Sequence, residues 1–215
     1  MNHYDRIAWI YDFLAKWVFG GNVLRSQCHF LSQMNPNERI IIIGGGSGKV
    51  LESINQLNIP LTIDFIEPST RMIEKARERI QESSNLNVNF HKIEFESYKS
   101  SEKYAWVCCF FFLDLFNKKS LQIHLDHIKS LMDIRSNLLV SDFEINKDSW
   151  WKKLLSYFMH LFFKATTGLE SNGLKDIDGT VMNSGFRKSE KLHFFSQFIF
   201  SAVYKKEVSK NGNHS

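Results

Sequence analysis

At residues 40–48 the chain reads IIIIGGGSG, and the architecture of the protein can be worked out from this segment. A run of four isoleucines is typical of a strand that is buried on both faces of a parallel sheet. Four of the next five residues are glycines, which let the backbone turn sharply and approach a ligand closely. Apolar residues at helical spacing begin at Val50. The segment therefore predicts a buried strand, a glycine loop and a helix whose N-terminus favours negative charge.

Strands and helices alternate along the rest of the chain. Apolar, β-branched and aromatic residues predict strands at 40–43, 61–67, 88–93, 106–112, 138–143, 187–195 and 198–204. Helices are predicted after the glycine loop and at 69–82, 118–132, 150–165 and 174–182. This alternation implies a mostly parallel sheet that is covered on both faces. Because only Ser196 and Gln197 separate the last two strands, we expect an antiparallel hairpin at the edge of a seven-stranded α/β sheet.

The length of 215 residues favours one domain with small additions. We expect an N-terminal helical extension at 1–35, the α/β domain at 36–205 and a polar tail at 206–215. Within the extension, Asn22 is expected to cap the second helix. No apolar run approaches the length of about 18 residues that a membrane span needs.

Charge and cysteine content narrow the functional class. The net charge of +4 is too small to indicate nucleic-acid binding by itself. Three cysteines, Cys28 and the adjacent pair Cys108 and Cys109, do not form the pattern of a disulfide framework or a metal site. We therefore expect no metal and a cytoplasmic protein with reduced thiols.

Two known ligand-binding loops at a helix N-terminus can be compared with this segment by their spacing. The phosphate loop of nucleotide hydrolases needs a hydroxyl after its lysine, and Val50 follows Lys49 here, which excludes that reading. The dinucleotide fingerprint needs a third glycine at position 49, where the lysine weakens the match but leaves it open. A glycine turn without any ligand is the remaining alternative.

An acidic residue stands where a nucleoside would need it. Glu67 ends the second predicted strand, nineteen residues after Gly48, and a carboxylate there can accept hydrogen bonds from a ribose diol. The alternative is a solvated glutamate at a strand end. The glycine loop and this carboxylate together favour a nucleoside-containing cofactor.

The spacing of Gly44, Gly46 and Gly48 resembles the first motif of class I S-adenosylmethionine-dependent methyltransferases. The segments 4–8 and 11–12 resemble the N-terminal helix of the ubiquinone/menaquinone-biosynthesis type, which folds over the cofactor. The resemblance implies a Rossmann-like, doubly wound sheet with an N-terminal helical cover, and S-adenosyl-L-methionine as the cofactor. The cofactor-binding residues that it implies are Tyr11, Gly44, Gly45, Gly46, Gly48, Glu67, Pro68, Ser69, Met72, Glu94, Phe95 and Phe110.

The resemblance departs from the family pattern at two positions. Ile42 replaces the acid that usually precedes the first glycine by two residues, and Ala105 replaces an aspartate that often opens the fourth strand. The first change removes a frequent partner of the methionine end of the cofactor. Because of this change, the alternative remains that the protein has this fold and binds a nucleoside without catalysing a reaction.

Methyl transfer from a sulfonium needs alignment more than a dedicated base. If the acceptor loses a proton, the group that takes it must lie at the carboxyl ends of the strands. Asp114, Asp142 and Tyr11 are the candidates, although an acid such as Asp114 more often caps the next turn and Asp142 can be a simple strand-end acid.

The acceptor is predicted from the aromatic residues. The fourth strand lacks the [DN]-P-P-[FYW] motif of enzymes that methylate adenine or glutamine amides, so no nucleic-acid partner is expected. The aromatic helix at 150–165 is flanked by lysines and is interpreted as core, pocket wall or peripheral membrane contact. We expect methyl transfer to a small, hydrophobic acceptor such as a quinone-like aromatic, a lipid or a secondary metabolite. The alternatives are an NAD-dependent oxidoreductase and a non-catalytic nucleoside-binding protein.

Overall fold

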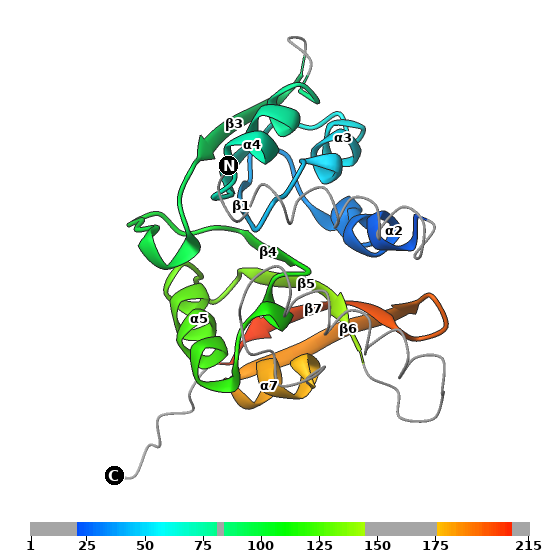
Figure 1. The fold of residues 1–215 in the computed structure, drawn as a ribbon, viewed down its shortest axis with the longest axis vertical. Helices are drawn as coiled ribbons and strands as arrows, with labels where there is room; N and C mark the ends of the chain where they lie inside the picture. The colour runs from blue at the N-terminus through cyan, green and yellow to red at the C-terminus, as the bar shows by residue number, and fades with distance from the viewer. Residues whose placement is uncertain (1–20, 81–83, 145–175, 208–215) are drawn as a thin grey trace.

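A computed structural model describes residues 21–80, 84–144 and 176–207, and its core is one seven-stranded sheet in the order β3-β2-β1-β4-β5-β7-β6 (Figure 1). Strands β1 to β5 pair in parallel, whereas β7 is antiparallel to both β5 and β6. The predicted mostly parallel sheet with an antiparallel C-terminal hairpin is therefore confirmed. The strands are β1 (Arg39–Ile43), β2 (Leu61–Ile66), β3 (Leu86–His91), β4 (Trp106–Phe110), β5 (Asn137–Phe143), β6 (Phe186–Phe194) and β7 (Ile199–Lys206).

Helices cover both faces of this sheet (Figure 1). Apolar residues of α2 and α3 join the hydrophobic cluster on one face, and those of α5 and α7 join the cluster on the other. The sheet is thus doubly wound, as predicted. The helices and 3-10 turns are α2 (Asn22–Cys28), η1 (Leu31–Gln33), α3 (Lys49–Asn55), α4 (Thr70–Arg77), η2 (Phe95–Ser97), η3 (Leu113–Leu115), α5 (Lys118–Ser130) and α7 (Ile177–Asn183).

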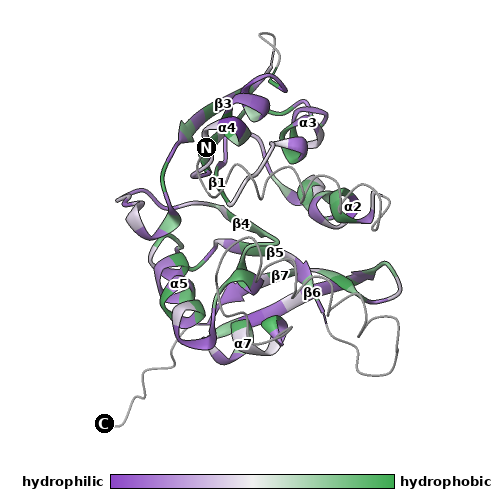
Figure 2. Ribbon diagram, in the orientation of Figure 1, coloured by the Kyte–Doolittle hydropathy of each residue, from purple (hydrophilic) through white to green (hydrophobic). Residues whose placement is uncertain are grey.

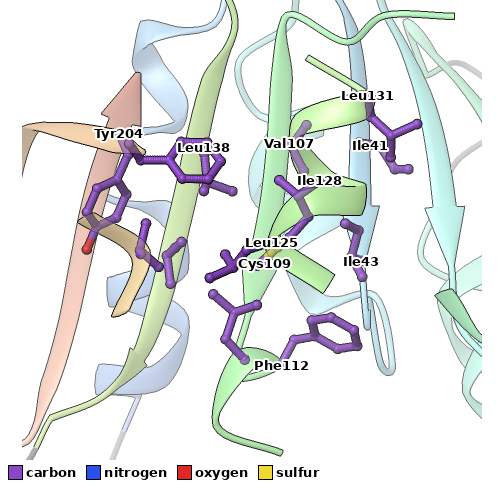
Figure 3. Packing of buried hydrophobic residues seen from close by; sticks show 14 of the residues in the cluster. Ile41, Ile43, Val107, Cys109, Phe112, Leu125, Ile128, Leu131, Leu138 and Tyr204 are labelled. Atoms are coloured by element: carbon purple, nitrogen blue, oxygen red, sulfur yellow. The ribbon is translucent and has the colours of Figure 1, made fainter. Parts of the chain in front are cut away.

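The centre of the sheet is the most apolar part of the described chain. Every residue of β4 is buried, whereas the edge strands β3 and β6 contain exposed residues, most of which are polar (Figure 2). Leu125 and Ile128 of α5 lie in the same cluster as Val107 and Cys109 of β4 (Figure 3). Residues buried on both sides of a sheet contribute most to the hydrophobic stabilisation of the fold.

Several predicted boundaries differ from the observed ones by a few residues, and three of the differences have a clear backbone reason. The fourth strand ends at Phe110 because Phe111 has a φ of 52°, which lies outside the β region. The hairpin connection spans 195–198, not two residues, because residues 195–197 all have positive φ and turn the chain before β7 begins. The N-cap of α2 is Gly21, with a φ of 83°, and Asn22 is the first helical residue.

Several predictions lie outside the described residues. They are the part of the N-terminal extension before residue 21 with Tyr11, the aromatic helix at 150–165, and the tail from residue 208. Among the helices in the described ranges, none is both long and apolar enough to cross a membrane.

Candidate functional site

The glycine loop between β1 and α3 combines tight packing with one open position. Gly44, Gly46 and Gly48 have φ values of 67°, 56° and 72°, which residues with a side chain rarely adopt. A Cβ on Gly45 would lie 2.2 Å from Cζ of Phe65, so β2 packs directly on the loop. A Cβ on Gly46 would meet no atom within 4 Å. The backbone at Gly46 is therefore accessible to a ligand, whereas its neighbours are held by the fold.

Glu67 follows β2, and its carboxylate accepts backbone hydrogen bonds from the glycine loop and from the turn that follows β2. Its Oε2 accepts the backbone N–H of Gly46 at 3.0 Å, and its Oε1 accepts the N–H of Ser69 at 2.9 Å. The backbone N–H groups of Gly44 and Gly45 donate to the carbonyl of Ile66 at 3.0 and 3.2 Å. The carboxylate predicted for ribose binding thus lies beside the open glycine, in a position that backbone hydrogen bonds define.

The residues after Glu67 start the next helix. Ser69 is the N-cap of α4, and its hydroxyl accepts the backbone N–H of Met72 at 3.3 Å. Met72 is buried, while Pro68 is partly exposed at the same turn. The structure therefore brings these three predicted cofactor residues to the same edge of the sheet as the glycine loop.

Arg79 holds the glycine loop from the other end of α4, a role that the sequence did not predict. Its Nε donates to the carbonyl of Ser47 at 2.7 Å, and its guanidinium forms an ion pair with Glu52 of α3. An arginine twelve residues after a strand-end acid carries no recognisable signal, because many surface arginines have that spacing. Only the packing of α4 against the loop reveals this contact.

The predicted adenine contacts lie in the turn after β3. Glu94 is exposed and precedes η2, whereas Phe95 is 3% exposed. The Phe95 ring stacks on His127 at 4.3 Å and meets the edge of Phe112 at 5.9 Å. Phe95 is thus a buried support of this turn, with Glu94 as its exposed neighbour.

The residues after β4 contact the glycine loop. Phe110 is buried, and Phe111 donates its backbone N–H to the carbonyl of Ser141 at 2.7 Å. The turn at Phe111 directs Phe112 back over the glycine loop, where a Cβ on Gly44 would lie 3.0 Å from the Phe112 ring. An aromatic residue in the left-handed region is strained, and such strain is held by the surrounding contacts. Sequence reasoning missed the contact of Phe112 with the glycine loop, because the direction of Phe112 depends on that one dihedral angle.

Two acids meet where β4 and β5 end. Asp142 is completely buried, and its carboxylate accepts the backbone N–H groups of Phe143 at 2.8 Å and Asp114 at 3.3 Å. Burial and the charge of Asp114 raise the pKa of the Asp142 carboxyl well above its usual value, despite these backbone hydrogen bonds. Asp114 is partly exposed. Asp142 therefore holds the turn after β4, and Asp114 is the member of the pair closer to solvent.

Other sequence features do not join this site. Cys108 and Cys109 are completely buried in β4, and burial raises the pKa of both thiols. Ile42, at the position where the family has an acid, is also completely buried in the sheet. In the described ranges, no three His, Cys, Asp or Glu side chains are grouped as metal ligands.

Comparison with known proteins identifies the fold. Residues 40–133 match the family model of a methyltransferase domain. Mitomycin 7-O-methyltransferase MmcR superposes with a TM-score of 0.65 at 16% sequence identity, over 86% of this chain and 54% of that protein. Magnesium protoporphyrin IX methyltransferase (ChlM) from Synechocystis PCC 6803, solved with S-adenosylhomocysteine, gives 0.63 at 16% identity, over 86% of this chain and 82% of that one. LepI in complex with S-adenosylmethionine gives 0.63 at 14% identity, over 80% of this chain and 43% of LepI.

These matches confirm the fold class predicted from the glycine motif. The fold is that of class I S-adenosylmethionine-dependent methyltransferases, and residues 40–133 match the model of a methyltransferase domain. The family uses S-adenosylmethionine as its methyl donor, in agreement with the predicted cofactor. The chain spans about half the length of MmcR and of LepI. No curated protein matches the sequence.

Proposed function

We propose that this chain transfers a methyl group from S-adenosylmethionine to a small, hydrophobic acceptor. The observation that carries the proposal is the Glu67 carboxylate at the open position of the glycine loop, bonded to the N–H of Gly46. A nucleoside that approaches Gly46 would place its ribose hydroxyls beside this carboxylate, which is an acceptor with room for several hydrogen bonds. The residues present therefore fit the cofactor that the domain family uses.

The cofactor supplies an activated methyl group when it is bound, and the protein supplies alignment. In the proposal, Glu67 orients the ribose, and the backbone of residues 44–48 contacts the methionine end of the cofactor. Glu94 contacts the adenine from the turn after β3, and Tyr11 covers the site from the N-terminal segment. Phe110 lines the side toward the acceptor.

The acceptor side is proposed to be apolar. Phe111, Phe143 and Phe198 form a row of aromatic contacts across the ends of β4 and β5 and the start of β7, with ring centroids 4.8 and 5.5 Å apart. The structural relatives MmcR and ChlM are named for small molecules, mitomycin and magnesium protoporphyrin IX. These features support a ring-containing acceptor, as does the resemblance to the ubiquinone/menaquinone type. The helix at 150–165 remains a prediction, as core, pocket wall or membrane contact.

If the acceptor loses a proton, we propose Asp114 as the group that receives it. Asp114 is partly exposed at the end of β4, whereas both oxygens of Asp142 accept backbone N–H groups in a completely buried position. Asp142 would then keep the turn that carries Asp114 in place. The three cysteines are free thiols, which supports the proposed location in the reducing cytoplasm.

Removing the ribose partner should weaken cofactor binding without unfolding the protein. We expect Glu67→Ala to weaken S-adenosylhomocysteine binding at least about tenfold, because a hydrogen bond to a charged group contributes about 1.5–3 kcal/mol. Glu67→Gln keeps one acceptor oxygen and should lose less. Isothermal titration calorimetry gives the affinities, and thermal unfolding checks that each variant is folded. An unchanged affinity in Glu67→Ala would remove Glu67 from the site.

A further inference from the structure

Side chains on either side of α4 hold the glycine loop. Before the helix, Oε2 of Glu67 accepts the backbone N–H of Gly46 at 3.0 Å. After the helix, Nε of Arg79 donates to the backbone carbonyl of Ser47 at 2.7 Å. The first bond fixes the peptide group that precedes Gly46, and the second fixes the one that follows Ser47. The open position of the loop therefore lies between two peptide groups that side chains hold in place.

The guanidinium group of Arg79 is oriented in turn by α3. Its Nη1 forms an ion pair with Oε1 of Glu52. Because a guanidinium group is planar and rigid, a partner at Nη1 also sets the direction of the Nε–H bond. Glu52 belongs to α3, the helix that begins directly after the loop. Arg79 thus joins α3, α4 and the glycine loop through one rigid group.

The glycine loop needs such support because of its composition. Glycine loses more conformational freedom on ordering than any other residue, and this loop holds four glycines in five positions. If the loop is already ordered before a ligand arrives, the cost of ordering it does not reduce the affinity. The peptide group that Arg79 holds leads into Gly48, which has a φ of 72° and is the N-cap of α3. Arg79 therefore holds the loop where it enters the helix.

We propose that Arg79 is a positioning residue for S-adenosylmethionine, because it holds the backbone of residues 44–48 in the conformation that receives the methionine end of the cofactor. The inference rests on the proposed function, which assigns the methionine end to this backbone. Arg79 acts only through the loop and does not itself touch the cofactor. Its removal should weaken the binding of the methionine end and leave the binding of the adenosine part unchanged.

Arg79 can be truncated without opening the hydrophobic core. Its side chain is 26% exposed. It lines a surface groove of about 680 Å³ between α3 and α4. Truncation at a groove wall leaves no enclosed cavity, so the large loss of stability that follows core truncation is not expected. A change in ligand affinity can therefore be measured on a folded variant.

Two variants and a matched control isolate the contact with Ser47. Arg79→Ala removes the contact. Arg79→Lys keeps the positive charge, but an ammonium group lacks the planar fork that binds Ser47 and Glu52 in one fixed geometry. Arg77→Ala is the control, because Arg77 lies in the last turn of the same helix and its guanidinium packs over the Phe90 ring, 4.5 Å from the ring centroid.

Calorimetric titration with two ligands shows which part of the cofactor depends on Arg79. S-adenosylhomocysteine keeps the amino and carboxylate groups of the methionine end, whereas methylthioadenosine keeps the adenine and ribose without them. We expect Arg79→Ala to bind S-adenosylhomocysteine about tenfold more weakly, the loss expected for one charge-assisted hydrogen bond. Its affinity for methylthioadenosine should equal that of the wild type.

The other variants should separate the two ends of the cofactor. Arg79→Lys should recover part of the lost affinity for S-adenosylhomocysteine, because the ammonium group can still donate to the Ser47 carbonyl. Arg77→Ala should match the wild type with both ligands. Glu67→Ala should weaken the binding of both ligands, because both contain the ribose.

Amide hydrogen exchange of the free protein gives a readout that does not depend on the cofactor. In Arg79→Ala, the amides of residues 44–48 should exchange faster than in the wild type, because the loop opens more often. In Arg77→Ala, their exchange should be unchanged. Equal losses of affinity for the two ligands in Arg79→Ala, or no loss for either, would overturn the proposal. If the wild type binds neither ligand, the proposed function fails instead, and the exchange rates still decide whether Arg79 holds the loop.

Discussion

Gly48→Ala is expected to lower the free energy of unfolding by about 2–5 kcal/mol and to abolish cofactor binding. A Cβ at this position would lie 2.5 Å from Cβ and 2.8 Å from Cα of Ala76, so α4 would have to move away from the loop. Overpacking of this kind costs about 1–3 kcal/mol. The φ of 72° adds about 1–2 kcal/mol for any residue with a side chain. Chemical denaturation measures the first effect and calorimetry the second.

Gly21→Ala separates strain from packing. Gly21 also has a positive φ, of 83°, but a Cβ there would meet no atom within 4 Å. Its cost should be limited to the strain of about 1–2 kcal/mol. Adding Ala76→Gly to Gly48→Ala should recover part of the packing loss, because it removes the nearer of the two clashing atoms. Equal costs for Gly48→Ala and Gly21→Ala would contradict the close approach of α4 to the loop.

Asp178→Ala is expected to cost about 3–5 kcal/mol, the range for removal of one partner of a buried ion pair. Asp178 of α7 accepts from Nζ of Lys188 at 2.8 Å, Nζ of Lys191 at 2.6 Å and the hydroxyl of Tyr204 at 2.7 Å. Without the carboxylate, Lys191 keeps its ion pair with Glu144 and its contact with the Phe200 ring, and the completely buried Tyr204 hydroxyl loses its acceptor. This cluster joins α7 to β6 and β7, so the hairpin edge of the sheet should loosen first.

The Asp178 carboxylate should also make the stability of the protein depend on pH. Burial alone would raise the pKa of Asp178, but hydrogen bonds from Lys188, Lys191 and Tyr204 hold it below its usual value. A depressed carboxyl pKa contributes stability above the unfolded value of about 3.9, and this stability is lost as the pH falls through the folded value. Asp178→Asn should keep the fold, and its stability should no longer fall with this group's titration at acid pH in denaturation curves.

Asp176→Ala is the control for Asp178→Ala. It removes only the N-cap of α7 and should cost about 0.5–2 kcal/mol. A similar cost for Asp178→Ala would show that the cluster contributes little.

The sheet and its order of elements were predictable because they depend on local patterns. Each buried strand is an apolar run, and each loop or helix between strands begins with a polar or glycine signal. The strand ends were less predictable, because they depend on single dihedral angles. The sequence pattern predicts Phe111 as a strand residue, and only its φ of 52° shows that β4 has ended. The same holds for the turn between β6 and β7.

The candidate site was predictable where a residue follows a strand directly. The glycine loop and Glu67 meet because the carboxyl ends of adjacent parallel strands lie at one edge of the sheet. The supports of the site come from helices, whose rotation about their axes has no sequence signature. Arg79 reaches Ser47, and His124 reaches Glu96, only because α4 and α5 pack at particular angles. The twofold role of Glu67, as loop support and proposed ribose partner, also appears only in three dimensions.

Parallel calorimetric titration of the wild-type protein with S-adenosylhomocysteine and NADH tests the central claim most directly. The glycine loop accommodates Lys49 as the first residue of α3, where a dinucleotide fingerprint would need a third glycine. The claim predicts saturable binding of S-adenosylhomocysteine, competition by S-adenosylmethionine and no binding of NADH at the same concentrations. Binding of NADH without binding of S-adenosylhomocysteine would contradict it.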